Sequence, residues 1–519
     1  FPGGRAEAPA VTEPVEAPLE PHWFTPSREK YAHGTKHWVD FQNDVTAADV
    51  RLAAREGYES VEHTKRYTTL GMANDQGKTS NINGLALLAQ ELGLPIPEVG
   101  TTTFRPPYTP ISIGAIAGRE AGPLFKPIRK TAMHGWHEAN GADFEPVGDW
   151  FRPYTYLRAG EDREAAVARE VANIRARVGM LDASTLGKIV VSGPDAAAFL
   201  DRIYTNMMSS LKVGRCRYAL MCNENGFLFD DGVVARLAED RFLLHTTTGG
   251  AERVHAHLEE WLQTEWWDLR VHVVNVTDQW AQIAVAGPKA RDVLREAGTD
   301  IDLSAEALSF MSWTEGTVAG CPVRLYRISF SGELGFEIAT PANRGRGLWD
   351  ALLAAGEAHG VMPYGTEALH VMRAEKGFIM IGDETDGTVT PQDLGLSWAV
   401  SRKKADFLGK RAQERIDLTR PDRKQLVGLL TEDPATVLPD GAHAVAELRE
   451  AGKAMRTIGH VTSTYRSPTL GRSIAMALIE RGRERHGETL AFPLEDGEVV
   501  RAEVVDPVFY DREGSRQNV

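Results

Sequence analysis

Cysteine, long apolar runs and excess positive charge are all scarce in this chain of 519 residues. Its three cysteines, Cys216, Cys222 and Cys321, form no paired disulfide framework and indicate a reducing compartment, so we expect a cytoplasmic protein. No apolar stretch approaches the roughly 20 residues that span a bilayer, which argues against a membrane role. The net charge of −14 argues against nucleic acid as a partner, because duplex binding needs clustered positive charge.

Several motifs that would define a catalytic class are also missing. There is no G-x-G-x-x-G fingerprint, so we expect no complete dinucleotide-binding unit within the chain. The 15 histidines show no metal-ligand spacing, and Cys216 with Cys222 is too small a set for a zinc or iron–sulfur site, so no metal is expected. The chain starts at Phe1 without the apolar core of a signal peptide, and we expect it to be a piece of a longer polypeptide.

What is present predicts an ordinary globular chain. Hydrophobic residues make up 42% and charged residues 25%, and the length suffices for about two to four domains. Residues 1–30, rich in Pro, Glu and Ala, predict a linker or extended tail. Residues 31–100 predict a small helical domain with a helix cap at Thr46 and helical spacing over 50–69. Residues 101–149 predict a connecting strap, since X-Pro pairs disfavour helix.

Helix and strand patterns alternate from about residue 150 onward. Residues 190–200 and 284–294 share a strand, a Gly-Pro pair with Pro at the first helical position, and an amphipathic helix, which suggests a duplicated architecture. Short strands and turns after residue 420 predict a β-rich terminal domain over 421–519. The whole pattern predicts an α+β fold with its largest domain over 150–420.

The segment Phe330–Glu337, Phe-Ser-Gly-Glu-Leu-Gly-Phe-Glu, is the most informative part of the chain. It predicts two short strands folded back over a glycine-containing turn, with Glu337 just beyond the turn. A carboxylate on a rigid hairpin can bind a flat donor edge through two hydrogen bonds. Pterin rings, the head group of folates, present such an edge, which makes Glu337 a candidate ligand-binding residue.

Two adjacent carboxylates lie in a predicted strand over 227–237. Because side chains alternate along a strand, Asp231 and Asp230 face opposite sides. Asp231 shares its face with apolar residues, where a carboxylate is costly unless it has partners, so it is the better candidate for a functional group. A turn Asp beside glycines is an equally weighted alternative. Arg373 lies near the end of a predicted helix, where an exposed Arg that suits the helix dipole is the commoner situation.

These elements, in this order, resemble the glycine-cleavage T-protein family, the folate-dependent aminomethyltransferases. The resemblance covers about residues 150–515. The matching positions are Gly193-Pro194, Asn206, Tyr218, Asp230-Asp231, Gly287-Pro288, Glu337, Arg373–Gly377, Gly382–Glu384, Leu394-Gly395, Trp398 and Ser467–Gly471. The amino-terminal part is similar to the alpha-subunit family of heterotetrameric sarcosine oxidases. The matching segments there are Trp38–Thr46, Lys65–Met72, Gly77–Asn81 and Gly100–Pro110.

The resemblance implies a three-lobed aminomethyltransferase-like folate domain with a C-terminal β-barrel-like domain, preceded by a small mostly helical domain. It implies that a flavin on a partner beta subunit oxidises sarcosine to an imine. Tetrahydrofolate would capture that imine in this chain, giving 5,10-methylenetetrahydrofolate and glycine. NAD is expected only on a missing upstream region, FAD and FMN with the partner subunits, and the beta, gamma and delta subunits as partners.

The same resemblance implies roles for individual residues. Asp231 would be the catalytic base and would stabilise the cationic imine, and Glu337 would clamp the pterin. The other expected folate-binding residues are Tyr218, Phe330, Arg373, Asp230 and Trp398. The family usually carries Tyr where this chain has Phe330, so a stacking contact is kept and a hydroxyl contact is lost. Two alternatives stay open: the large subunit of an N-methylglutamate dehydrogenase, and a non-catalytic scaffold of a flavoenzyme complex.

Overall fold

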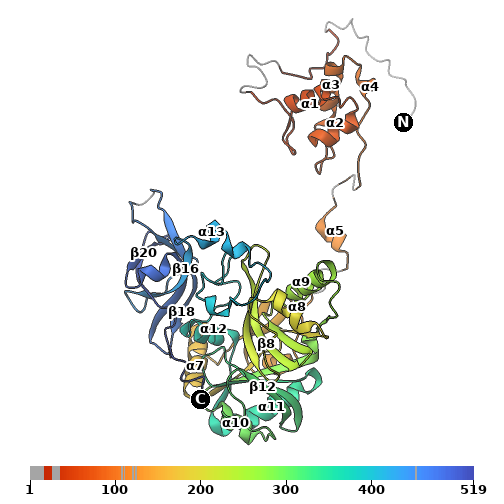
Figure 1. Ribbon diagram of the computed structural model, residues 1–519. Coiled ribbons are helices and arrows are strands. Elements are labelled where there is room, and N and C mark those ends of the chain that lie inside the picture. Colours follow the sequence, from red (N-terminus) through yellow and green to blue (C-terminus); the bar gives the residue numbers. More distant parts are fainter. Residues whose placement is uncertain are drawn as a thin grey trace, which may run out of the picture. The chain divides into compact units, whose positions relative to one another are not determined.

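The computed structural model describes residues 17–25, 35–106, 109, 111–119, 122, 125–450 and 453–519. The chain forms two compact units, residues 1–126 and 127–519 (Figure 1). Most of the tail predicted over residues 1–30 lies outside the described residues. None of the helices in the described part of the chain has the length and apolar composition that crossing a bilayer demands.

The smaller unit is mainly helical. Its elements are β1 (Trp38–Asp40), β2 (Val45–Thr46), α1 (Ala47–Arg55), α2 (Val61–Thr68), α3 (Asn81–Leu92), α4 (Ile96–Val99) and α5 (Ile113–Ala117). The cap predicted at Thr46 is present as a capping box, in which the Asp49 carboxylate accepts the Thr46 backbone N–H at 2.8 Å. The helical spacing predicted over 50–69 is divided between α1 and α2, because Gly57 adopts a φ of +92° and ends the first helix.

Two sheets form the first two lobes of the larger unit. One has the strand order β10-β6-β9-β8-β7 and is antiparallel throughout. Its strands are β6 (Gly187–Ser192), β7 (Cys216–Cys222), β8 (Leu228–Ala238), β9 (Arg241–Thr246) and β10 (His272–Asn275). Helices α8 (Ala196–Ile203) and α9 (Ala251–Thr264) pack on it and bury Phe199, Leu200, Val254 and Leu258.

The second sheet has the order β12-β13-β14-β11-β5-β15. Its strands are β5 (Val178–Asp182), β11 (Trp280–Ala286), β12 (Ser312–Val318), β13 (Cys321–Arg327), β14 (Gly335–Pro341) and β15 (Val361–Pro363). The associated helices are α7 (Arg163–Ala176), α10 (Ala290–Glu296), α11 (Gly345–Gly356) and α12 (Thr366–Glu375). Ile283, Leu348 and Trp349 are fully buried in its core, which is why the apolar face of α11 lies against this sheet.

The duplicated strand–Gly-Pro–helix pattern places one copy in each sheet. Gly193 (φ +131°) and Gly287 (φ +126°) follow β6 and β11, and a Cβ at either would lie within 2.5 Å of a backbone oxygen, so only glycine fits. Pro194 and Pro288 lie in the turn two residues before their helices begin. The prediction of Pro at the first helical position was wrong, because Asp195 and Lys289 occupy the N-cap positions and the helices begin at the residues that follow.

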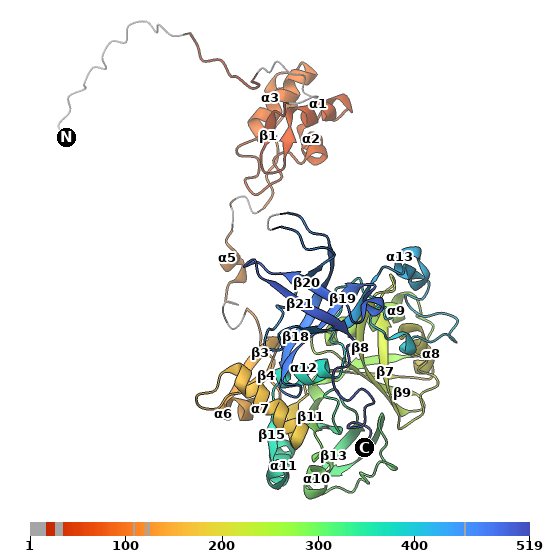
Figure 2. The ribbon, with the colours of Figure 1, turned by 90° about the vertical axis from the view of Figure 1, so that its left-hand side faces the viewer.

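The third lobe is a closed barrel with the order β16-β19-β18-β17-β20-β21. Figure 2 labels four of its strands, β18 to β21. Its strands are β16 (Lys424–Thr431), β17 (His443–Val445), β18 (Thr457–Ser467), β19 (Arg472–Glu480), β20 (Thr489–Pro493) and β21 (Val499–Val505). A short helix, α13 (Ile416–Thr419), precedes it. The predicted α+β fold, with a C-terminal barrel and a small helical region ahead of it, is confirmed.

Two local predictions need correction. The strap predicted to reach residue 149 ends earlier, because α6 (His134–Ala139) and the hairpin of β3 (Ala142–Val147) with β4 (Trp150–Tyr156) belong to the larger unit. Within Phe330–Glu337 only the second strand exists, since residues 330–334 form a bend between β13 and β14. Arg175 holds this bend by donating to the Ser331 carbonyl at 2.9 Å and to the Glu333 carboxylate at 2.8 Å.

Candidate functional site

A cavity of about 1260 Å³ lies in the larger unit and is lined by residues of both sheets and of the segment 377–398. Pockets for drug-sized ligands are commonly about 300–1,000 Å³, so this one has room for a folate-sized molecule and a small second ligand. Of the predicted site residues, the wall includes Tyr218, Asp231, Phe330, Glu337 and Trp398.

Asp231 and Tyr218 meet across two neighbouring strands. Tyr218 on β7 is opposite Val233 on β8, and Asp231 lies two residues from Val233 on the same face of the sheet. The Tyr218 hydroxyl donates to Asp231 Oδ2 at 2.5 Å, a short charge-assisted contact. The strand alternation predicted for this segment therefore holds, and Asp231 is directed toward the cavity.

The protonation of Asp231 is set by its surroundings. Burial raises the pKa of Asp231 to about 7, the neighbouring Asp230 charge adds to the rise, and the Tyr218 hydroxyl opposes it. A carboxyl with this pKa exchanges a proton near neutral pH. Asp230 is 1% exposed and is not part of the cavity wall. Its Oδ1 accepts from the Thr247 hydroxyl at 3.1 Å, while its buried Oδ2 has no hydrogen-bond partner among the described residues.

Glu337 is held on the second sheet. It lies on β14 opposite Ala284 of β11, so Gln282, two residues along the same face, reaches it and donates its amide to Glu337 Oε2. Burial raises the pKa of Glu337, and the Gln282 hydrogen bond and the Lys188 charge oppose the rise. Lys188 is itself 1% exposed, and burial lowers its pKa to about 8. The carboxylate is thus fixed in place with acceptor capacity left for a ligand.

Aromatic rings also line the cavity. Phe330 stacks on Phe378 with ring centroids 6.1 Å apart and an interplanar angle of 12°. Trp398 lies 6.1 Å from the ring of Tyr218 and is 69% exposed, so it occupies the rim of the cavity. Flat apolar surfaces of this kind suit a heteroaromatic ring.

Arg373 is placed behind the cavity and is not part of its wall. Its side chain is 0% exposed and donates to Glu384 at 2.8 Å, to Ser463 on β18 at 2.8 Å and to Asp383 at 3.1 Å. These contacts tie α12 to the barrel, and direct contact of Arg373 or Asp230 with folate stays a prediction.

Some cavity residues were missed from the sequence. Gln282 is the one polar residue in the strand Trp280–Ala286, and an isolated amide in an otherwise apolar strand is a signal for a buried partner. His245 lines the cavity, with its Nδ1–H donating to the Val233 carbonyl at 3.0 Å. Burial lowers the pKa of His245 to about 4, so it is neutral at pH 7. No sequence pattern predicts that His245 lines the cavity, because its hydrogen-bond partner, the Val233 carbonyl, lies on another strand.

Fold and cavity together define an aminomethyltransferase-like protein. The structure is similar to the glycine cleavage system aminomethyltransferase T from Bartonella henselae, with a TM-score of 0.64 and 29% identity, covering 74% of this chain and 99% of that one. Residues 133–404 match the model of the GCVT N-terminal domain, and residues 424–511 match that of the glycine cleavage T-protein C-terminal barrel domain. An aminomethyltransferase of Thermotoga sp. (strain RQ2) is 32% identical over 74% of this chain and 98% of its own length. The chain belongs to the glycine-cleavage T-protein family.

A second set of similarities covers the whole chain. Residues 34–119 match the model of the sarcosine oxidase A3 domain. The sarcosine oxidase subunit alpha of Corynebacterium sp. (strain U-96) is 51% identical over 99% of this chain and 54% of its own length. Both resemblances inferred from the sequence are therefore confirmed. The chain spans about half the length of the curated sarcosine oxidase subunits it matches.

Proposed function

We propose that this chain is the folate-binding part of a sarcosine oxidase alpha subunit, in which the methylene group of the sarcosine-derived imine passes to tetrahydrofolate. The products are 5,10-methylenetetrahydrofolate and glycine. The observation that carries the proposal is the presence of Asp231 and Glu337 on the wall of one cavity, each on a different sheet. The similarity to aminomethyltransferases and to sarcosine oxidase alpha subunits supports it.

In this proposal some cavity residues bind the folate and another transfers a proton. Glu337, fixed by Gln282, accepts hydrogen bonds from the N–H edge of the pterin. Phe330 and Phe378 provide a flat surface for the ring. Tetrahydrofolate supplies the nucleophilic nitrogens that take up the methylene group. Asp231, ionised in about half of the molecules near its pKa of about 7, stabilises the cationic imine, accepts a proton from the attacking folate nitrogen and returns it to the departing glycine amine.

The rest of the assembly follows from the same proposal. The imine arises on a flavin of the beta subunit, FAD and FMN lie with the partner subunits, and gamma and delta subunits complete a heterotetramer. NAD binds a region outside this chain. The three cysteines are free, which agrees with the cytoplasmic location proposed from the sequence.

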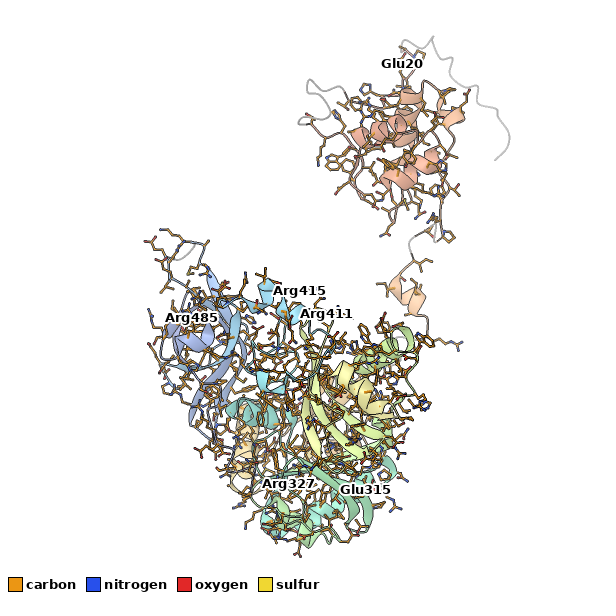
Figure 3. All side chains as sticks on the ribbon, in the orientation of Figure 1. Glu20, Glu315, Arg327, Arg411, Arg415 and Arg485 are labelled. Atoms are coloured by element: carbon orange, nitrogen blue, oxygen red, sulfur yellow. The ribbon has the colours of Figure 1, made fainter. Side chains whose placement is uncertain are left out.

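Calorimetric titration of this chain with tetrahydrofolate tests the binding role. Glu337→Gln removes the buried charge and should weaken binding by about 2–5 kcal/mol, as loss of one partner of a desolvated charged contact does elsewhere. Glu315, labelled in Figure 3, is 65% exposed on β12, and Glu315→Gln is the matched control with unchanged binding. Equal affinities for the wild type and Glu337→Gln would refute the clamp, and absence of any binding would favour a scaffold.

A further inference from the structure

The cavity has a second polar region, distinct from Asp231 and Glu337. We name it the Arg152 patch; its members are Glu145 on β3, Arg152 on β4, Thr185, Thr248 and Thr366. Glu145 Oε1 accepts from Arg152 Nε at 3.0 Å and from the Thr366 hydroxyl at 2.6 Å. The hydroxyls of Thr185 and Thr248 lie 3.0 Å apart. All five residues line the cavity, and the reaction proposed above uses none of them.

Arg152 has hydrogen-bonding capacity that the described residues leave unused. Its guanidinium carries five N–H donors. Besides the Glu145 contact, Nη1 reaches the Thr248 hydroxyl only at 3.5 Å, the outer limit for a hydrogen bond, and Nη2 has no partner among the described residues. The side chain is only 16% exposed, so bulk water does not freely replace the missing acceptor. Burial also lowers the pKa of Arg152, as expected for a cation short of acceptors.

The unused donors form one planar edge. Glu145 fixes the Nε side of the guanidinium, which leaves Nη1 and Nη2 available for a planar bidentate acceptor. The Thr248 hydroxyl adjoins this edge. It shares one hydrogen bond with the Thr185 hydroxyl, which leaves one of the two O–H donors for a ligand. Arg253 also lines the cavity, but its side chain is exposed and donates to the Phe229 carbonyl at 2.8 Å, so water can satisfy its remaining donors.

The Arg152 patch is connected to the reacting end of the cavity by one short loop. Thr248 follows Thr247 in the segment between β9 and α9, and the Thr247 hydroxyl donates to Asp230, the neighbour of Asp231. A ligand held at Arg152 is therefore in the cavity that contains Asp231.

We propose that Arg152 is a carboxylate-binding residue, which receives a ligand carboxylate on its Nη1–Nη2 edge. The inference rests on the proposed function, which brings two carboxylate-bearing molecules into this cavity. One is tetrahydrofolate, through its glutamyl tail, and the other is the imine, through the carboxylate that remains on its product glycine. Planar carboxylate is the chemistry the two share, and Arg suits it better than Lys because the fork geometry matches two oxygens.

The test is titration of the 519-residue chain and its Arg152→Met variant with three ligands. These are tetrahydrofolate, tetrahydropteroate, which lacks the glutamyl carboxylates, and glycine added to the folate-saturated chain. Charge-assisted hydrogen bonds to a carboxylate correspond to a loss of about tenfold or more in affinity. Loss for tetrahydrofolate but not tetrahydropteroate identifies the glutamyl tail as the ligand, and loss for glycine identifies the imine carboxylate.

Two controls separate binding from folding. Arg152→Met together with Glu145→Gln removes the carboxylate that the single variant leaves unpaired, and it should fold while still losing the affinity. Arg253→Met should bind all three ligands as the wild type does. Unchanged affinity of Arg152→Met in all three titrations overturns the inference while the proposed function stands. A wild-type chain that fails to bind tetrahydrofolate refutes the proposed function, and the inference falls with it.

Discussion

Replacing Tyr218 by Phe should raise the pKa of Asp231. The phenol donates to Asp231 Oδ2 at 2.5 Å and stabilises the ionised carboxylate. A hydrogen bond to a charged group contributes about 1.5–3 kcal/mol, and each pKa unit corresponds to about 1.4 kcal/mol. Water that enters the space left by the hydroxyl replaces part of the lost hydrogen-bond energy. We therefore expect the pKa of Asp231 to rise by about one unit from its present value of about 7. At pH 7 the ionised fraction should fall from about one half to about one tenth.

The assay is a pH titration of the carboxyl ¹³C resonance of Asp231 in protein labelled at Asp, with the signal assigned from its absence in Asp231→Asn. Asp230→Asn is the matched control, in which the pKa of Asp231 should shift in the opposite direction. Removing the adjacent negative charge should lower that pKa. A Tyr218→Phe titration midpoint that is unchanged or lower would refute the view that this hydroxyl holds the carboxylate in its ionised form.

Two further predictions concern stability. The pKa of Asp231 rises from 3.8 to about 7 on folding, so its contribution to stability is complete below about pH 4 and is lost as the pH rises through 7. Asp231→Asn should therefore be stabilised relative to the wild type at pH 8, by at most about 4 kcal/mol, in pH-dependent denaturant unfolding; a pH-independent difference would contradict this. Arg373→Met leaves Glu384 buried without its cation and should cost about 3–5 kcal/mol in the same assay. Arg346→Met, at an exposed pair with Asp350, should cost less than about 1 kcal/mol, and equal losses would count against the buried network.

The sequence predicted those parts of the site that depend on local periodicity. Asp231 lies toward the cavity because strand alternation is a local property of β8, and a single residue's shift would have turned it away. The position of Glu337 beyond a glycine-containing turn was likewise readable from eight residues, although only one of the two predicted strands exists there. Residues 330–334 form a bend instead of the first predicted strand, and Arg175 holds this bend. Arg175 lies 155 residues before Phe330, so no local pattern reveals the contact.

The contacts of residues whose partners are distant in the chain could not be predicted from the sequence. The position of Arg373 near a helix end favours a solvent-exposed side chain, whereas the structure buries it. Its acceptors come from residues 383, 384 and 463, and the last of these lies on the barrel. Arg152 gave no signal at all, because its unused donors become visible only once β4 is packed beside the cavity.

The most direct measurement of the central claim is the product ratio of the assembled enzyme carrying Asp231→Asn, with sarcosine and tetrahydrofolate as substrates. Under the proposed function, sarcosine oxidation should continue at the partner flavin while the product shifts from 5,10-methylenetetrahydrofolate to formaldehyde, because Asp231→Asn removes the base from the cavity where the imine would be captured. An unchanged ratio of the two products would contradict the assignment of this cavity as the site of methylene transfer.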